Sequence, residues 1–327
     1  MLPLQRIDCL ARSGFRGQWT GAAPFRRTIV KVLTMPSVTI THSTVYHYRT
    51  EVTLGSHRLM LRPRETRDLS LTSFDLKVCP EARIDWSHDV AGNTIATAQF
   101  DTKTTMLSIR SRAFVDLRAP VWPIFPIAAA AASYPFTYSP EDWTDLGALV
   151  TPDYVDDTGR LSQWVKHFVM GRPTDTLSLL KDISNGITAA ISYQSRETEG
   201  TQGPLETLDR GWGSCRDFAV LFVEAARTLG FGARIVSGYL FNPLGNEVGS
   251  AGSGSTHAWV EVFLPGAGWI PFDPTNRSVG STNLIPVAVA RRIEQVAPVC
   301  GNFFGRPADV SSMEVSVHVE DAACVPS

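Results

Sequence analysis

Three residues in the second half of the chain have the side chains of a nucleophile, a base and an orienting acid. The first, Cys215, follows Gly211-Trp-Gly-Ser and begins an amphipathic stretch, so we predict that it lies in the first turn of a helix. Such a helix end carries a partial positive charge and free N–H groups, which favour a thiolate over a thiol and can stabilise an oxyanion. The sequence therefore predicts that Cys215 is a nucleophile.

His257 and Asp273 are predicted to complete this site. His257 opens a strand directly after a segment rich in glycine and serine, and Asp273 follows the next strand. The turn Pro265-Gly-Ala-Gly joins the two strands. Counting outward from that turn, we expect His257 and Asp273 to face each other across the hairpin. The imidazole would then move the proton, and the carboxylate would hold its tautomer.

Four neighbouring residues are candidates for the wall of a substrate cleft. They are Trp212, Gly213, Ser214 and Trp259. Aromatic side chains near a cleft both pack in the core and shape access to it, and the sequence leaves both roles open for the two tryptophans. The acid two residues after the nucleophile, Asp217, is expected to cap the helix or pair with an arginine rather than take part in the chemistry.

The hydrophobic pattern divides the chain into a strand-rich region and a region that begins with helices. β-Branched and aromatic residues alternate with polar ones over residues 38–121, which predicts a β-sandwich-like domain. Pro120, Pro123 and Pro126 then interrupt the pattern and predict a linker. The predicted boundaries are 35–125 for the β-rich domain, 126–160 for the linker, 161–320 for the catalytic domain and 321–327 for a tail.

Residues 1–34 are left out of this division because their composition is unusual. They contain five arginines and a single acid, Asp8, which is typical of a transit peptide. An upstream start codon explains them as well, and we favour it because a strand pattern begins directly after Met35. We therefore interpret residues 1–34 as a mis-started or disordered extension.

In the second region, helical patterns precede strand patterns. Apolar spacing predicts helices that begin near Leu161, after Thr174 or Asp175, and at Cys215, the last ending at Gly230. A loop is predicted over residues 194–208, and strands over 233–241, 257–264 and 269–272. Helices followed by an antiparallel sheet predict an α+β fold.

Composition argues against several classes of protein. Apolar residues make up 43% of the chain and charged residues 19%, with a net charge of −2. These values fit a globular protein with a real core and give no reason to expect nucleic acid or a membrane as a partner. No apolar run approaches the roughly 20 residues of a spanning helix. The five cysteines are far apart and form no C-x-x-C pair, so we expect neither a zinc site nor a disulfide framework. The lack of a disulfide framework predicts a cytoplasmic location.

The residues around the three site positions resemble the bacterial transglutaminase-like proteins. The segments that carry the resemblance are Gly211-Trp-Gly-Ser-Cys-Arg-Asp-Phe-Ala, His257-Ala-Trp-Val-Glu-Val, Asp273-Pro-Thr-Asn, His57-Arg-Leu-Met-Leu-Arg-Pro-Arg and Gly92-Asn. The resemblance spans residues 38–319. It implies a papain-like core of helices packed on an antiparallel sheet, preceded by the β-rich region of the bacterial members. It also implies that Cys215, His257 and Asp273 form a catalytic triad that needs no cofactor.

One segment departs from the family pattern. Where the family usually has Val-Gly-Arg-Asp-Tyr, this chain has Val289-Ala-Arg-Arg-Ile, which lacks the aspartate and the tyrosine. If that segment helps to shape the substrate cleft, the substrate preference differs from that of other members. The triad is unaffected.

Together these features predict cysteine-dependent acyl transfer on peptide or glutamine-type amides. A thioester on Cys215 would be resolved by water or by an amine, and we favour hydrolysis. The alternative is a non-catalytic protein-binding module on the same fold, although a binding role does not require all three residue types. A metal site built from Cys215, His257 and Asp273 is a poor alternative because it lacks a fourth ligand. The expected partner is a protein or peptide substrate, and the oligomeric state stays open.

Overall fold

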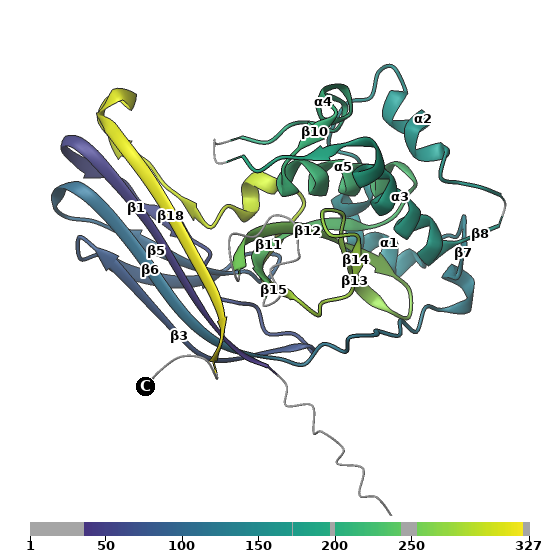
Figure 1. Ribbon diagram of the computed structural model, residues 1–327, viewed down its shortest axis with the longest axis horizontal. Helices are drawn as coiled ribbons and strands as arrows, with labels where there is room; N and C mark the ends of the chain where they lie inside the picture. The colour runs from purple at the N-terminus through teal and green to yellow at the C-terminus, as the bar shows by residue number, and fades with distance from the viewer. Residues whose placement is uncertain (1–35, 172, 197–199, 243–253, 323–327) are drawn as a thin grey trace, which may run out of the picture. The chain divides into compact units, whose positions relative to one another are not determined.

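The computed structural model describes residues 36–171, 173–196, 200–242 and 254–322 (Figure 1). Residues 1–34, interpreted above as a mis-started or disordered extension, lie outside the described residues, and so does most of the predicted tail. Contacts group the chain into two units, Met1–Thr34 and Met35–Ser327, and the second unit is the subject here.

The amino-terminal strands form two antiparallel sheets that share a core. Sheet A contains β17 (Phe303–Phe304), β18 (Val310–Asp321), β1 (Ser37–Leu54), β6 (Lys103–Leu117) and β3 (Leu69–Cys79). Sheet B contains β16 (Val299–Cys300), β2 (His57–Leu59), β5 (Thr94–Gln99) and β4 (Arg83–His88), in that order. Buried side chains from both sheets, including Leu59, Ala98 and Ile109, form one cluster. This is the strand-rich, sandwich-like region that the alternating pattern predicted.

The long strand at the end of the described chain belongs to the amino-terminal sheet. β1 is paired on one edge by β6 and on the other by β18. The pairing of β1 with β18 runs from Val38 opposite Asp321 to Tyr48 opposite Val310, with one irregularity after His47. Thus the final part of the range predicted as the catalytic domain contributes its strand to the sheet of the first region.

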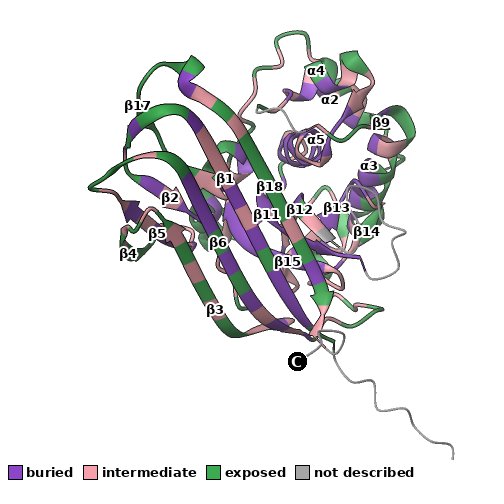
Figure 2. Ribbon diagram, turned by 60° about the vertical axis from the view of Figure 1, so that its left-hand side comes forward, coloured by how far each residue is buried: buried purple, intermediate pink, exposed green. Residues whose placement is uncertain are grey.

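The second region packs helices on an antiparallel sheet, as the α+β prediction required. Sheet E contains β14 (Ser278–Val279), β13 (Gly268–Asp273), β12 (Gly254–Leu264), β11 (Ala233–Phe241) and β15 (Leu284–Ala290), in that order. The helices are α2 (Arg160–Lys166), α3 (Thr176–Ala190), α4 (Pro204–Arg210) and α5 (Cys215–Thr228). α5 lies against β11 and β12 and is packed on its other sides by α2, α3 and α4. Figure 2 shows that α5 is buried along almost its whole length.

Smaller elements complete the chain. They are η1 (Ala129–Ala131), β7 (Ser133–Tyr134), α1 (Pro140–Leu146), η2 (Gly147–Val150), β8 (Thr174–Asp175), β9 (Ser192–Tyr193), β10 (Trp212–Gly213), η3 (Ile293–Val296) and η4 (Pro307–Asp309). Among the described residues, no helix is both long enough and apolar enough to cross a membrane.

Two segments contain helices that the sequence patterns did not reveal. Residues 194–208, predicted to be a loop, include the start of α4. Pro204 occupies the first turn of that helix and Gly211 ends it at φ 67°. Gly203 is the N-cap residue, so Gly203 and Pro204, which suggested a loop, mark the start of a short helix. The range predicted as a linker contains α1, where the Ser139 side chain accepts a hydrogen bond from the Asp142 N–H at 3.0 Å.

Candidate active site

Cys215 is the first residue of α5, as the amphipathic pattern predicted. Gly213, two residues earlier, lies where a Cβ atom would come within 3.0 Å of the Asp217 Cβ and 3.4 Å of the Phe218 ring. The chain thus passes so close to its own helix that a side chain at position 213 would push against that helix. Both predicted cleft residues beside the nucleophile, Gly213 and Ser214, are buried.

The carboxylate of Asp217 organises the start of α5. Its Oδ2 accepts hydrogen bonds from the Ser214 N–H at 2.8 Å and the Ser214 hydroxyl at 2.9 Å. Its Oδ1 accepts from the Arg196 guanidinium and from the Gln202 N–H, both at 2.7 Å. This confirms the capping and arginine-pairing role expected for Asp217. Ser214 is the N-cap residue of α5, and the bond from its N–H to Asp217 is the one that the acid of a capping box makes.

His257 and Asp273 meet across the hairpin. The His257 Nε2 lies 2.9 Å from the Asp273 Oδ2, and both side chains are buried. The register of β12 against β13 pairs Val260 with Phe272. If this register is continued by one residue, Trp259 lies directly opposite Asp273. The contact with His257 is therefore diagonal rather than directly across. It forms because residues two apart on a strand point to the same face.

Three further hydrogen bonds hold the Asp273 carboxylate. Its Oδ1 accepts from the backbone N–H groups of Thr275 at 2.9 Å and Asn276 at 3.3 Å. Its Oδ2 also accepts from the Asn276 side-chain amide at 2.8 Å. The Asp-Pro-Thr-Asn turn thus folds back onto its own first residue. Burial raises the pKa of Asp273, but the charge and hydrogen bond of His257 and these donors outweigh burial and leave the pKa below its ordinary value.

Cys215 and His257 shift each other toward the charged forms. Burial raises the pKa of the Cys215 thiol, but the imidazole of His257, the Ala258 backbone and the charge of Arg216 together bring it below the ordinary value. Burial lowers the pKa of His257, whereas the Asp273 carboxylate and Cys215 raise it to about 10. These directions favour a thiolate beside an imidazolium at neutral pH.

The second ring nitrogen of His257 is the one available for chemistry. Its Nε2 is engaged by Asp273, whereas its Nδ1 is buried and has no hydrogen-bond partner within the described part of the chain. Because a carboxylate fixes the tautomer at one nitrogen, the other is positioned to exchange a proton with Cys215. The structure therefore brings together all three residues that the sequence singled out.

The two predicted cleft tryptophans have different surroundings. Trp259 is 1% exposed, and its ring stacks on that of His257 with centroids 6.1 Å apart and planes 26° apart. It also lines a pocket of about 340 Å³ together with Leu284 and Trp269. Trp212 is half-buried, and the Arg210 guanidinium lies 5.5 Å from its ring centroid. A role for either ring in binding substrate stays a prediction.

Tyr193 is a site residue that sequence reasoning missed. It is half-buried on β9, which pairs in parallel with β10 so that Tyr193 lies opposite Gly213. Burial, followed by the nearby charge of Cys215, raises the pKa of Tyr193 to about 12. The pairing joins two strands of two residues each, which are too short to give a periodic pattern. The phenol therefore stays neutral and can donate a hydrogen bond near the nucleophile.

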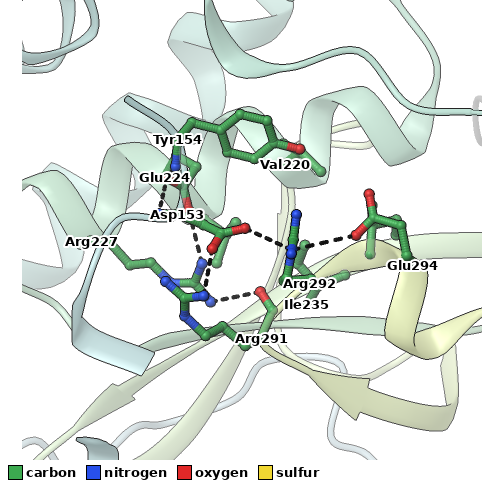
Figure 3. A pocket seen from close by; sticks show the side chains of 11 residues that line it. Asp153, Tyr154, Val220, Glu224, Arg227, Ile235, Arg291, Arg292 and Glu294 are labelled. Carbon is green, nitrogen blue, oxygen red and sulfur yellow. Dashed lines mark hydrogen bonds and ion pairs between the residues drawn. The ribbon is translucent and has the colours of Figure 1, made fainter. Parts of the chain in front are cut away.

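A second cluster of charges surrounds the other end of α5 (Figure 3). Glu224 and Arg227 form a buried ion pair at 2.8 Å. The other carboxylate oxygen of Glu224 accepts from the N–H groups of Asp153 at 2.7 Å and Tyr154 at 3.0 Å. Arg227 also donates to the backbone carbonyls of Leu149, Ala233 and Arg291. Figure 3 shows Asp153 between Arg291 and Arg292, with which it forms ion pairs. This cluster ties the chain before α2 to α5 and to the end of β15.

Proteins of similar sequence, and one solved structure of similar fold, match most of the chain. Uncharacterised proteins of Mycobacterium tuberculosis and Mycobacterium leprae are 29% and 24% identical to it, over 294 and 288 residues. The matches cover 86% of this chain in both cases, and 91% and 97% of the relatives. The crystal structure of a "putative cysteine protease" from Cytophaga hutchinsonii superposes with a TM-score of 0.68 at 21% identity, covering 89% of this chain and 93% of that one.

The family models match both regions of the fold. Residues 162–274 match the transglutaminase-like superfamily, a range that includes Cys215, His257 and Asp273. Residues 38–116 match the bacterial transglutaminase-like N-terminal region, which corresponds to most of the strands of the first region. Residues 162–274 therefore form a transglutaminase-like core, and residues 38–116 form the N-terminal region found in its bacterial members.

Proposed function

We propose that this protein catalyses acyl transfer from a peptide or glutamine-type amide through a thioester on Cys215. The observation that carries the proposal is the buried pair of His257 and Asp273, with one imidazole nitrogen held by the carboxylate and the other without a partner. A cysteine at the start of a helix, together with a histidine that a carboxylate holds in place, provides the nucleophile, the base and the orienting group of such a site.

In the first half of the reaction, the Cys215 thiolate attacks the amide carbonyl carbon. A carbon–sulfur bond forms, and the carbonyl π electrons move onto oxygen to give a tetrahedral oxyanion near the start of α5. Collapse of this intermediate breaks the carbon–nitrogen bond. The imidazolium of His257 donates its proton to the departing nitrogen, which leaves as ammonia or an amine.

In the second half, neutral His257 accepts a proton from the incoming nucleophile. Water yields a carboxylic acid, whereas a primary amine yields a new amide, and Cys215 leaves as a thiolate in both cases. We favour hydrolysis and a polypeptide substrate. A reducing compartment such as the cytoplasm suits this chemistry, because the nucleophile must remain a free thiol.

Selective alkylation of Cys215 tests the proposal. Cys79 and Cys300 are free and exposed, whereas Cys215 is only partly exposed. Exposure alone would therefore make Cys215 the slowest of the three to react. With iodoacetamide at pH 6, followed by peptide mapping, we expect Cys215 to react at least tenfold faster than either, because ordinary thiols are almost fully protonated there. Equal rates at the three sites would contradict an activated nucleophile.

Trapping experiments separate the two outcomes of the thioester. A library of glutamine-containing peptides is incubated with the protein, with and without a labelled primary amine. Release of ammonia or of a shorter peptide without label incorporation indicates hydrolysis, and label incorporation indicates transamidation. Specific peptide binding by a protein whose Cys215 is no more reactive than Cys79 would instead favour the binding-module alternative.

A further inference from the structure

From Met313 to Glu320, strand β18 has apolar and polar residues at alternate positions. Its inner face carries Met313, Val315, Val317 and Val319, and its outer face carries Glu314, Ser316, His318 and Glu320. This period of two is typical of a strand with one face covered by protein and the other facing water. An apolar residue on the inner face should therefore be covered.

The cover stops halfway along the inner face. Val319 is fully buried and Val317 packs against the core that includes residues of sheet E. Val315 and Met313, on the same face, are 50% and 41% exposed. We call these two residues the β18 strip. Figure 2 shows β18 exposed over most of its length, with one short buried stretch near the end of the strand.

The covered half of this face meets the sheet that holds the catalytic histidine. β18 contacts β11 and β12. Val317 lies opposite His42, whose Nδ1 is 3.0 Å from the Tyr239 hydroxyl. Tyr239 in turn lies opposite Thr256, the residue before His257. The β18 strip therefore begins two strand residues, about 7 Å, beyond Val317, which packs against the core that includes residues of this sheet.

The strip also extends toward the side on which the nucleophile lies. Figure 1 shows β18 running past the ends of β11 and β12, with its first half on the same side of sheet E as α5. α5 begins at Cys215. The free edge of the strand adds a second feature, because β18 pairs with β1 alone among the described strands.

We propose that the β18 strip binds apolar side chains of an extended segment of the polypeptide substrate. The segment lies along β18 and places its amide at Cys215, with apolar residues at alternate positions against Val315 and Met313. A strand edge beside an apolar face is the arrangement used when a peptide adds to a sheet. This inference rests on the proposed function, because it names the class of substrate for the same site.

The size of the strip favours a peptide over a second copy of the chain. Two half-exposed side chains offer on the order of 10² Å², whereas a stable dimer buries about 1,200–2,000 Å². One or two side chains of a bound peptide are enough to cover an area of this size. Continuity with the partly buried contact at Val317 favours a peptide that runs toward sheet E over one bound at a remote surface.

Binding is best measured without turnover, in the Cys215→Ala background. The probes are two fluorescein-labelled eight-residue peptides with a central glutamine, one flanked by leucine and valine and the other by serine and aspartate. The test variant is Met313→Gln with Val315→Thr, which changes polarity with little change in shape. The matched control is Glu314→Gln, which lies between them on the outer face.

By fluorescence anisotropy, we expect the apolar peptide to bind at least tenfold more tightly than the polar one. The double substitution should weaken binding of the apolar peptide about tenfold, while Glu314→Gln changes it less than twofold. Equal binding of the two peptides, no binding of the apolar peptide, or no effect of the double substitution would each overturn the inference.

Alkylation of the Cys215-containing protein separates this inference from the function on which it rests. Fast iodoacetamide labelling of Cys215, unchanged by Met313→Gln and Val315→Thr, together with weakened peptide binding supports both. Fast labelling without any effect on binding overturns the subsite alone. Slow labelling overturns the proposed function and, with it, the assignment of the strip as part of a substrate site.

Discussion

The two ends of α5 both bury charged side chains, and they do so in different ways. At the first end, Cys215 lies near a histidine whose Nδ1 has no partner in the described structure. At the other end, Glu224 and Arg227 pair with each other and form hydrogen bonds with backbone groups of five other residues. Burial lowers the pKa of Arg227, but the charge of Glu224 opposes this.

The difference shows that a buried charge by itself does not identify a reactive site. A carboxylate and a guanidinium that form hydrogen bonds with each other and with the backbone around them lose these favourable interactions when they move. Such a pair therefore holds the surrounding segments together, and we call it a clamp. A thiol and an imidazole that shift each other toward the charged forms, with one nitrogen left over, can transfer a proton without disturbing the structure. Both arrangements are built on a single buried helix, and the following predictions test whether they are separable.

Removal of the base should have the largest effect. His257→Ala is expected to lower amidase activity about 10⁴-fold, because the thiolate and the leaving amine both lose their proton partner. The rate of Cys215 alkylation at pH 6 should fall toward that of Cys79. The matched control is His318→Ala on the exposed outer face of β18, which should leave both rates unchanged. Full activity in His257→Ala would show that the first end of α5 is not a catalytic site.

Neutralising the orienting acid should have the next largest effect and should move the pH profile. In Asp273→Asn, the charge that raises the pKa of His257 is lost, so the pKa of that imidazole falls from about 10. The imidazolium then loses its proton at a lower pH, so the alkaline limb of the pH profile of kcat/KM shifts to lower pH. We expect kcat to fall about 10³-fold at neutral pH, measured by steady-state kinetics from pH 5 to 10. An unchanged alkaline limb would exclude this role for Asp273.

Breaking the clamp should affect stability but not reactivity. Glu224→Gln leaves Arg227 buried without its counter-charge and should lower the free energy of unfolding by about 3 kcal/mol in urea titrations. In the folded protein, Cys215 alkylation should change less than twofold. Replacing both partners, in Glu224→Leu with Arg227→Met, should recover part of the loss. A tenfold drop in alkylation with the fold intact would mean that the two ends are coupled.

A third buried group should reveal itself only through the pH dependence of stability. Burial lowers the pKa of His42 from 6.5 to about 4, and both its nitrogens lie 3.0 Å from hydroxyl groups, of Tyr239 and Thr44. Below pH 6.5 the unfolded chain binds a proton that the folded chain does not, so stability falls as pH drops. We expect His42 to contribute about 2 kcal/mol of this fall between pH 7 and pH 5.

The measurement compares urea unfolding of the wild type and His42→Gln at these two pH values. Glutamine can form hydrogen bonds in place of the imidazole but does not titrate, so the variant should lose about 2 kcal/mol less on acidification. The same pH dependence in both proteins would show that His42 is already accessible to protons in the folded state.

Local signals were enough to predict the helix that begins at Cys215 and the first strand that follows it. Gly-Trp-Gly-Ser before Cys215 and Gly230 after the apolar run predicted a helix that the structure places at Cys215–Thr228. The strand predicted over residues 233–241 matches β11. In contrast, α4 was hidden because its capping glycines and proline, within a polar segment, are also the residues of loops.

Cys215, His257 and Asp273 could be singled out in the chain as candidates because each lies in a short segment whose turn or cap chemistry places it at the end of an element. Where those ends meet depends on the register of β12 against β13, which makes the contact between His257 and Asp273 diagonal. The addition of β18 to β1, the neighbours of Tyr193 and the clamp around Glu224 join residues far apart in the chain. Pairings of that kind leave no periodic signal, since their partners are selected only when burial and hydrogen bonding are satisfied across the whole fold.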